Sequence, residues 1–238
     1  MNENIENVDY QEINKFSQQA KSWWDETGDS APLHIINPIR LQFIQKKCGN
    51  SLEQSKILDV GCGGGILTES LAKNLADVSG IDMNKKLIEI AKLHAKMNKL
   101  NINYECISTM EYAKKHAQQF DIITCMELLE HVPNPKAMLK DIATLLKPDG
   151  KLFISTINRN LQSYLGAVIG AEYLFKLLPI GTHDYQKFIK PSELAAWARE
   201  QQLKLFSIKG IDFKPIKKTA ELSDAVNINY IAGFIKDC

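Results

Sequence analysis

Short apolar runs alternate with amphipathic stretches along most of the chain. The runs have the length of buried strands and are bounded by turn residues. They are Lys56–Val60, Val78–Ile81, Asn103–Ile107, Phe120–Met126 and Lys151–Thr156. Strands that alternate with helices form a mostly parallel sheet whose two faces are both covered. The pattern therefore predicts an α/β fold with helices on both faces of the sheet.

The helices between these strands have local start signals. One helix is predicted from Ile66 to Leu75, directly after a glycine-rich stretch. Asn84 is a suitable cap for a helix from Lys85 to about Met97. Asn134-Pro135 places a capping residue before proline at the first helical position, which predicts a helix to Leu146. The four residues 147–150 (Lys-Pro-Asp-Gly) are predicted to form a turn.

The two ends of the chain depart from this regular alternation. The N-terminal part predicts an amphipathic helix over Ile13–Trp24, a loop with two prolines, and a second helix over Ile39–Lys47. The C-terminal part predicts an apolar segment over 161–181, a helix that starts near Pro191, and strands near 203–209 and 228–235. We find neither a repeat nor a low-complexity linker. The chain is therefore expected to form one domain (1–238), with a helical cap (1–50), a core (51–238) and an apolar insert near 161–183.

Composition and charge exclude several classes of protein. The 238 residues carry a formal net charge of +1, which disfavours a nucleic-acid binder that relies on a positive field. The five cysteines form no Cys-x-x-Cys pair, which is typical of reduced thiols in a cytosol-like compartment. No uninterrupted apolar stretch reaches the ~18 residues of a membrane-spanning helix, and we see no targeting signal. These features predict a cytoplasmic protein.

The most informative stretch follows the first strand, where residues 59–65 read Asp-Val-Gly-Cys-Gly-Gly-Gly. Glycines at such a strand-to-helix turn allow a ligand to approach the backbone closely. Asp82 ends the next strand, 21 residues after Gly61, where its carboxylate can accept hydrogen bonds from both hydroxyls of an adenosine ribose. The alternative is a glycine-rich turn with an aspartate that caps a helix. A nucleoside-containing ligand is favoured, because the strand, the glycine turn, the helix, the second strand and the aspartate follow one another in the expected order and spacing.

The details of the loop favour one class of nucleoside. A dinucleotide-binding loop has glycine at the position that Ile66 occupies, and a nucleoside-triphosphate loop has a Lys-Ser/Thr pair that is missing here. Asp59, two residues before Gly61, suits a ligand with an ammonium or sulfonium group better than a pyrophosphate. S-adenosylmethionine carries both cations. A nicotinamide-dependent dehydrogenase remains the alternative from another class, and a cofactor-binding module without catalysis is a third.

The sequence resembles the class I S-adenosylmethionine-dependent methyltransferases, and most closely their ubiquinone-biosynthesis O-methyltransferase family. The resemblance runs from about Phe16 to Tyr230. The motifs that carry it lie in the glycine loop and at 23–25, 32–34, 36–40, 80–83, 124–133, 147–150, 155–160, 170–173, 181–184 and 187–191. It implies a Rossmann-like fold with a seven-stranded, mostly parallel sheet and an N-terminal helical cap.

The resemblance also implies a set of cofactor-binding residues. Arg40, Gly61, Asp82 and Met126 take the family's cofactor positions, with Asp82 on the ribose and Arg40 on the methionine carboxylate. Asp59, Gly63 and Met83 belong to the same motifs and are expected to bind the cofactor as well. The implied reaction moves a methyl group to a hydroxyl of 3-demethylubiquinol and of the earlier 2-polyprenyl-6-hydroxyphenol. A methyltransferase for another small phenol is the alternative within this class.

The candidate catalytic residues follow the fourth strand. Glu127, Glu130 and His131 have the i, i+3, i+4 spacing that places side chains on one face of a helical turn. His131 can be the general base that takes the phenolic proton. The three side chains can instead hold a divalent cation such as Mg²⁺ that lowers the pKa of the catechol. They can also merely cap and solubilise a turn before Pro133.

Two weaker candidates lie further along the chain. His183 with Asp184 can contact the quinol, although a surface histidine explains the pair better. The segment 161–178 has apolar residues at helical spacing, and the simpler interpretation is a helix that closes the site. Because polyprenyl substrates reside in membranes, the segment can also make a weak peripheral contact at the inner face of the membrane. The expected partners are the polyprenyl catechol or hydroquinol and other ubiquinone-biosynthesis enzymes, with no nucleic acid.

Overall fold

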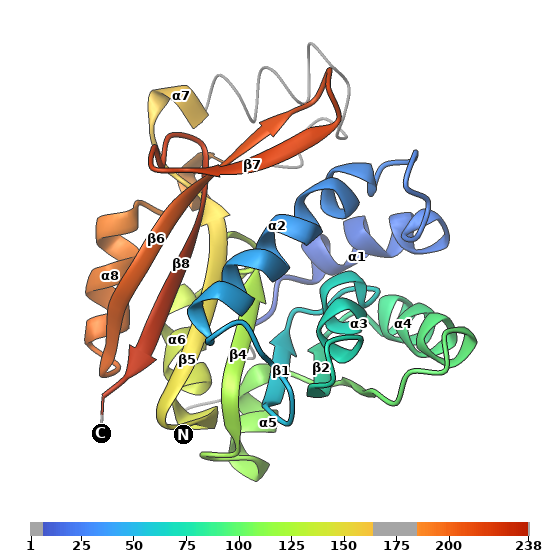
Figure 1. Cartoon of the computed structure of the whole chain (residues 1–238), viewed down its shortest axis with the longest axis horizontal. Coiled ribbons are helices and arrows are strands. Elements are labelled where there is room, and N and C mark those ends of the chain that lie inside the picture. The colour runs from blue at the N-terminus through green and yellow to red at the C-terminus, as the bar shows by residue number, and fades with distance from the viewer. Residues whose placement is uncertain (1–6, 164–184, 238) are drawn as a thin grey trace.

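An eight-stranded sheet runs through the part of the chain that the computed structural model describes, residues 7–163 and 185–237 (Figure 1). Its strand order is β3-β2-β1-β4-β5-β8-β6-β7. The strands are β1 (Lys56–Val60), β2 (Asp77–Asp82), β3 (Asn103–Cys106), β4 (Phe120–Met126), β5 (Leu146–Ile157), β6 (Leu203–Lys214), β7 (Thr219–Ser223) and β8 (Asn229–Lys236).

The pairing in this sheet changes direction once. β1 to β5 pair in parallel, whereas β8 pairs antiparallel with both β5 and β6, and β7 pairs antiparallel with β6. The strand order reverses between β1 and β4, from which β2 and β5 continue in opposite directions. In open α/β sheets a crevice forms at this switch point, outside the carboxyl ends of the strands, and binds ligands.

Helices cover both faces of the sheet, as the sequence predicts. The helical elements are α1 (Tyr10–Gln19), η1 (Ala20–Ser22), α2 (Ala31–Lys47), α3 (Ile66–Ala72), α4 (Lys85–Met97), α5 (Thr109–Lys115), η2 (Leu129–His131), α6 (Pro135–Leu145), α7 (Leu161–Ser163), η4 (Tyr185–Lys187) and α8 (Pro191–Arg199). Figure 1 shows α2 and α3 in front of the strands, with α5, α6 and α8 on the opposite side.

The two-residue period of the strands divides the core between these layers. In β5, Leu152 and Ile154 belong to the apolar cluster that includes α5, α6 and α8, whereas Phe153 between them packs with residues of α2 and α3. All three side chains are fully buried. Burial of each such side chain contributes about 1.5–3 kcal/mol, so both helical layers are held on the sheet by apolar contact.

The structure corrects the expected number of strands. Seven were expected, and the eighth is β7, which pairs with the distal part of β6 (Gly210–Lys214) to form a hairpin. Its sequence, Thr-Ala-Glu-Leu-Ser, has no apolar run that would identify a buried strand. The predicted turn at 147–150 is also wrong, since these residues lie within β5. There the pairing with β4 shifts register, from Phe120↔Leu146 to Ile122↔Lys151.

The N-terminal helical cap is confirmed in kind, but its bounds differ. α1 ends at Gln19, earlier than predicted, and α2 begins at Ala31 rather than at Ile39. Pro32 lies in the first turn of α2, where a missing N–H breaks no helical hydrogen bond, and Pro38 lies within the helix. Most of the apolar insert near 161–183 is outside the described residues. None of the helices in the described ranges combines the length and the apolar character needed to cross a bilayer.

Candidate active site

A cavity of about 940 Å³ opens at the switch point of the sheet. Its walls come from the ends of β1, β2 and β4, from α1 and α2, and from the β6–β7 hairpin. The cofactor-binding residues and the three catalytic candidates expected from the sequence all line it. They are Arg40, Asp59, Gly61, Gly63, Asp82, Met83, Met126, Glu127, Glu130 and His131. The structure thus brings the expected cofactor-binding and catalytic groups into one space.

The glycine loop depends on backbone conformations that favour glycine. Gly61 and Gly63 have φ values of +71° and +54°. A Cβ on Gly61 would lie 2.7 Å from Leu128 Cδ2, and one on Gly63 would lie 2.6 Å from Trp23 Cζ2. The Gly61 N–H donates to the carbonyl oxygen of Ile81 at 2.8 Å, which joins the loop to β2. The loop therefore leaves its backbone open to the cavity while side chains pack closely on its other sides.

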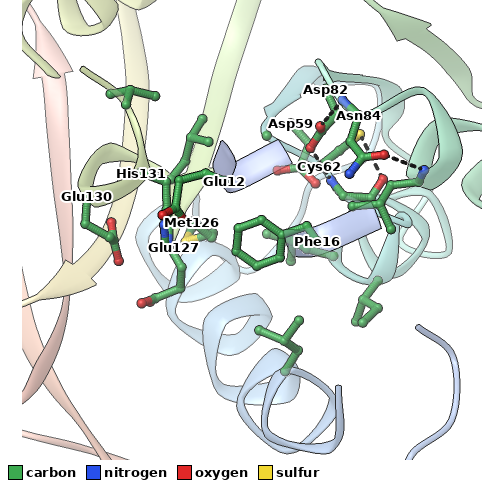
Figure 2. Close-up of a pocket in the computed structure, with 18 of the residues that line it drawn as sticks. Glu12, Phe16, Asp59, Cys62, Asp82, Asn84, Met126, Glu127, Glu130 and His131 are labelled. Atoms are coloured by element: carbon green, nitrogen blue, oxygen red, sulfur yellow. Dashed lines mark hydrogen bonds and ion pairs between the residues drawn. The ribbon is translucent and has the colours of Figure 1, made fainter. Parts of the chain in front are cut away.

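Asp82 is fixed at the end of β2 by backbone donors. Its Oδ2 accepts from the Gly63 N–H at 2.9 Å and its Oδ1 from the Asn84 N–H at 2.7 Å (Figure 2). Burial raises the pKa of this carboxyl, although these hydrogen bonds act in the opposite direction. The backbone of Met83 also contributes a hydrogen bond, and Asp82 lines the cavity, where its carboxylate can accept from the hydroxyls of a ligand.

Asp59 lies deeper, at the end of β1, and is 3% exposed. Thr124 Oγ1 donates to its Oδ1 at 2.6 Å and Thr68 Oγ1 to its Oδ2 at 2.7 Å. Burial raises its pKa to about 6, and the two threonine hydrogen bonds and the positive charge of Arg40 counteract this only in part. A buried carboxylate with this raised pKa favours a cation nearby.

Arg40 reaches the cavity from α2 and is 5% exposed. Its Nη2 donates to Glu127 Oε1 at 3.0 Å, so the arginine pairs with a carboxylate of the chain itself. Its Nε has no hydrogen-bond partner among the described residues, and neither has Nε1 of the buried Trp23. Both side chains line the cavity. Two buried donors near the glycine loop are therefore available to an anionic group.

Two methionines complete the expected cofactor set. Met126 ends β4 and Met83 follows Asp82, and both are partly buried. Figure 2 shows Met126 beside Glu127 and His131, on the side of the cavity away from Asp82. A flexible thioether side chain packs readily against a ligand of irregular shape.

The three candidate catalytic side chains do not share one helical face. Glu127 has φ +50° and precedes the short 3₁₀ turn η2, which contains Glu130 and His131. Glu127 Oε1 accepts from Ser155 Oγ at 2.6 Å as well as from Arg40, and Glu130 Oε2 accepts from Thr156 Oγ1 at 2.8 Å. His131 contacts a third partner, Glu12 of α1. Within the described ranges no group of three or more His, Cys, Asp or Glu is arranged to hold a metal ion.

Glu130 is the most deeply buried acid of this set, at 3% exposure. Burial raises its pKa, the negative charge of Glu127 raises it further, and His131 opposes the shift. Its Oε1 lacks a hydrogen-bond partner in the part of the chain that the structure describes. Glu130 therefore offers the cavity a free carboxyl oxygen with a raised pKa.

Helix α1 supplies site residues that sequence reasoning missed. Glu12 Oε2 lies 3.0 Å from His131 Nδ1, and the ring of Phe16 meets the imidazole edge-on, with centroids 5.2 Å apart. Burial lowers the pKa of His131, but the hydrogen bond with Glu12 and the charges of nearby carboxylates outweigh it, so the net pKa is raised. No local sequence signal connects Glu12 to a residue 119 positions away. The other candidates, His183 and Asp184, lie outside the described residues.

Comparison with known proteins places the chain among methyltransferases. A family model described as a methyltransferase domain matches residues 34–208. The chain is 53% identical over 229 residues to the ubiquinone biosynthesis O-methyltransferase of Coxiella burnetii (strain RSA 331 / Henzerling II), covering 96% of this chain and 97% of the relative. It is 49% identical to the protein of the same name from Haemophilus ducreyi, covering 96% and 98%.

A solved structure shows the same fold at low identity. The magnesium protoporphyrin IX methyltransferase from Synechocystis, with bound SAH, superposes with a TM-score of 0.68 over 96% of this chain and 97% of that chain. The two sequences are 17% identical. This likeness supports the Rossmann-like architecture of the chain.

Proposed function

The chain belongs to the ubiquinone-biosynthesis O-methyltransferase family, and we propose that it methylates a polyprenylated phenol in the cavity at the switch point of the sheet. It is an S-adenosylmethionine-dependent enzyme that forms an ether from a hydroxyl group. The acceptors are a hydroxyl of 3-demethylubiquinol and a hydroxyl of the earlier 2-polyprenyl-6-hydroxyphenol. The observation that carries this proposal is the convergence of all the expected site residues on one cavity.

The residues at the glycine loop fit S-adenosylmethionine. Asp82 lines the cavity beside the glycine loop, where its carboxylate can accept from ribose hydroxyls. The unpartnered Arg40 Nε and Trp23 Nε1 suit the methionine carboxylate, and the carboxylate of Asp59 favours the nearby positive charges. A volume of about 940 Å³ is near the upper end of ligand pockets, which leaves room for an acceptor beside the cofactor.

The acceptor end of the cavity has both apolar and acidic walls. Phe213 and Pro215 from the β6–β7 hairpin and Val132 after η2 line it, as do Glu130 and His131. When bound, the cofactor supplies an electrophilic methyl group on a sulfonium. The chain aligns the hydroxyl with that methyl, which removes much of the entropic barrier, and takes the phenolic proton. His131 is assigned as the general base.

Glu130 is the second candidate for the base, because its Oε1 is unpartnered and its pKa is raised. The two assignments differ in their mutants. His131→Gln should lower kcat by about 10²–10⁴-fold if the imidazole takes the proton, whereas Glu130→Gln should then lower it much less. The reverse order would assign the proton transfer to Glu130. The affinity for S-adenosylmethionine, measured by calorimetry, serves as the control for folding in both variants.

A divalent cation does not fit the three side chains as they are arranged. Glu127 is held by Arg40 and Ser155, Glu130 by Thr156, and His131 by Glu12. Among the described residues, these three side chains are not gathered as the ligands of a single ion would be. A cation therefore enters no step of the proposed mechanism, and thorough chelation should leave turnover unchanged.

The direct test combines purified protein, methyl-labelled S-adenosylmethionine and a short-tailed demethylubiquinol. Mass spectrometry should find the labelled ether, in equal yield with and without chelator. Cofactor binding without ether would refute the assigned acceptor, and a panel of small phenols would then test the alternative within this class. Loss of product on chelation would refute the metal-free mechanism while retaining the reaction.

A peripheral membrane contact is the remaining part of the proposal, because a polyprenylated acceptor resides in a bilayer. The 161–178 segment lies almost wholly outside the described residues, but the β6–β7 hairpin offers a second candidate surface. Ile216 at its tip is 86% exposed, and Lys217 and Lys218 beside it are exposed as well. An apolar side chain flanked by cations suits an anionic lipid surface. Contact with other ubiquinone-biosynthesis enzymes stays a prediction.

Sedimentation with phosphatidylglycerol vesicles tests this surface. Replacing Lys217 and Lys218 together by Glu should reduce the bound fraction. The matched control replaces Lys96 and Lys99 at the end of α4, which lies away from the hairpin (Figure 1). Equal sedimentation of both double variants would exclude the hairpin as the lipid contact.

A further inference from the structure

Helix α1 is held over the cavity by contacts on two sides. Asn84 Nδ2 donates to the carbonyl oxygen of Ile13 at 3.0 Å, and Ser17 Oγ donates to Asn84 Oδ1 at 3.2 Å. Near its other end, Lys187 Nζ lies 3.2 Å from an oxygen of Asp9, the residue that caps α1. These contacts fix the helix relative to both the cofactor loop and the acceptor end, so its side chains have defined positions in the cavity wall.

Glu12 is the side chain of α1 that forms a hydrogen bond with His131. Its Oε2 is 3.0 Å from His131 Nδ1, and both side chains are 12% exposed. Figure 2 shows Glu12 directed at His131, with Phe16 from the next turn of the same helix in the cavity. A carboxylate therefore contacts one ring nitrogen of His131, and an aromatic ring limits its rotation.

The charges around this pair keep Glu12 ionised. Its hydrogen bond with His131 lowers its pKa to about 2, with help from Lys15 at 2.9 Å, although burial acts in the opposite direction. Lys187 Nζ is also within 4.0 Å of Glu12. The groups that face His131 from the sheet side are the carboxylates of Glu127 and Glu130. An ionised acceptor at Nδ1 selects the tautomer that carries its proton there, which leaves the lone pair on Nε2.

We propose that Glu12 is a positioning residue that holds His131 in the tautomer and orientation needed to take a proton from the acceptor hydroxyl. This inference rests on the proposed function, with His131 as the base. The hydroxyl O–H bond breaks and its proton moves to Nε2 as the oxygen–methyl bond forms. The methyl–sulfur bond breaks with its electron pair left on sulfur. The imidazolium that results is stabilised by the Glu12 carboxylate, as in other carboxylate–histidine pairs.

The position of α1 matters for the base. Glu12 is part of α1, and α1 forms a wall of the cavity. His131 therefore keeps its orienting carboxylate only while this helix is in place.

The kinetic test compares two single variants of α1. Glu12→Gln keeps the size of the side chain but removes its charge, and should lower kcat at least about tenfold with little change in KM for the cofactor. Asn14→Ala changes an exposed residue of the same helix and leaves the contacts of Glu12 intact, so it should leave kcat within about twofold of the wild type. Glu12→Asp should recover part of the lost activity. A wild-type kcat in Glu12→Gln, or an equal loss in Asn14→Ala, would overturn the proposal.

A second measurement does not depend on activity. Nitrogen NMR of histidine-labelled protein, with the His131 signal assigned from His131→Gln, should show a proton on Nδ1 in the neutral wild-type ring. In Glu12→Gln this preference should be lost and the pKa of His131 should fall, which a purely structural contact would not cause. An unchanged tautomer and pKa would refute the role of Glu12. If the wild-type protein methylates no phenol, the proposed function fails, but this spectrum still decides whether Glu12 orients His131.

Discussion

Asp59→Asn tests whether the site holds a destabilising charge in the absence of ligand. Asp59 is 3% exposed, and burial raises its pKa to about 6 from an ordinary 3.8. Between these values the native protein binds more protons than the unfolded chain does. The stability that protonated Asp59 contributes is therefore fully present below about pH 4, and it is lost as the pH rises through about 6.

The size of the effect follows from the shift. A rise of about two units corresponds to about 3 kcal/mol, at about 1.4 kcal/mol per unit, and about 1.4 kcal/mol of this is lost between pH 5 and pH 8. Asparagine keeps one oxygen for Thr124 or Thr68, and the other hydroxyl must turn to accept from its amide, at a cost of about 1 kcal/mol. At pH 8, Asp59→Asn should therefore unfold with a free energy about 2 kcal/mol higher than the wild type.

Urea denaturation of both proteins without cofactor, at pH 5 and pH 8, measures this difference. The advantage of Asp59→Asn should grow by about 1.4 kcal/mol between the two pH values. The surface variant Asp121→Asn is the control with opposite sign. Lys147 and the Lys56 N–H hold the pKa of Asp121 below its ordinary value despite partial burial, so its stabilising effect appears above about pH 4.

The result that would refute this reasoning is an Asp59→Asn protein less stable than the wild type at pH 8, or a difference that does not change with pH. Saturating S-adenosylmethionine should reduce or reverse the advantage, because the wild type binds the cationic cofactor more tightly and gains more stability from it. The charge of Asp59 would then be a case of stability given up for binding.

Three further predictions concern the loop, the ribose site and the core. Gly65→Ala should lose about 2–4 kcal/mol of unfolding free energy, because φ is +90° and the new Cβ would lie 2.4 Å from Tyr104 Oη. Gly49→Ala, at φ +78° in open space, should lose only about 1 kcal/mol by the same denaturation assay, and equal losses would contradict the packing argument. Asp82→Asn should weaken cofactor binding about 10–100-fold in calorimetry, and a Kd within twofold of the wild type would exclude its role. Phe153→Ala should cost about 3–5 kcal/mol, since its ring is fully buried against α2, and a loss below 1 kcal/mol would indicate a core that collapses around the gap.

Elements with strong local signals are the ones that the sequence predicts correctly. The bounds of β1, β4 and α4 are all confirmed. The two strands are short and mostly apolar, and Asp59, Asp121 and Thr124 are the polar residues inside them. The helix has an asparagine cap whose side chain accepts from the N–H groups of Lys86 and Leu87. In each case short-range patterning and tertiary burial agree, so the pattern alone is sufficient.

The elements that the sequence did not predict are those in which the local pattern and the tertiary packing disagree. α5 (Thr109–Lys115) has seven mostly polar residues and is marked chiefly by its Ser108 cap. The first turns of α2 contain two prolines, which favour a loop unless the helix is stabilised by packing. That packing comes from Phe43 and Ile44 against the sheet, and local sequence cannot report it.

The site shows the same division. The glycine loop and Asp82 are predictable because the chain places them on successive strand ends, which meet at one edge of a parallel sheet. The contacts at the acidic end are not predictable in this way. Arg40 contacts Glu127 and Glu12 contacts His131 across long separations in sequence. Helical spacing predicted one shared face for Glu127, Glu130 and His131, and the left-handed backbone of Glu127 breaks that pattern.

The position of β8 constrains how the molecule can assemble. It is the last of the described strands along the chain, yet it lies between β5 and β6 and pairs with both. The β6–β7 hairpin therefore joins the sheet through a strand made after it. Such non-local pairing delays folding, because a long loop must close before its contacts form. During synthesis the edge of β5 that pairs with β8 stays unpaired until β8 has been made. Until then, this edge is the part of the sheet that is exposed to a chaperone or to pairing with a wrong strand.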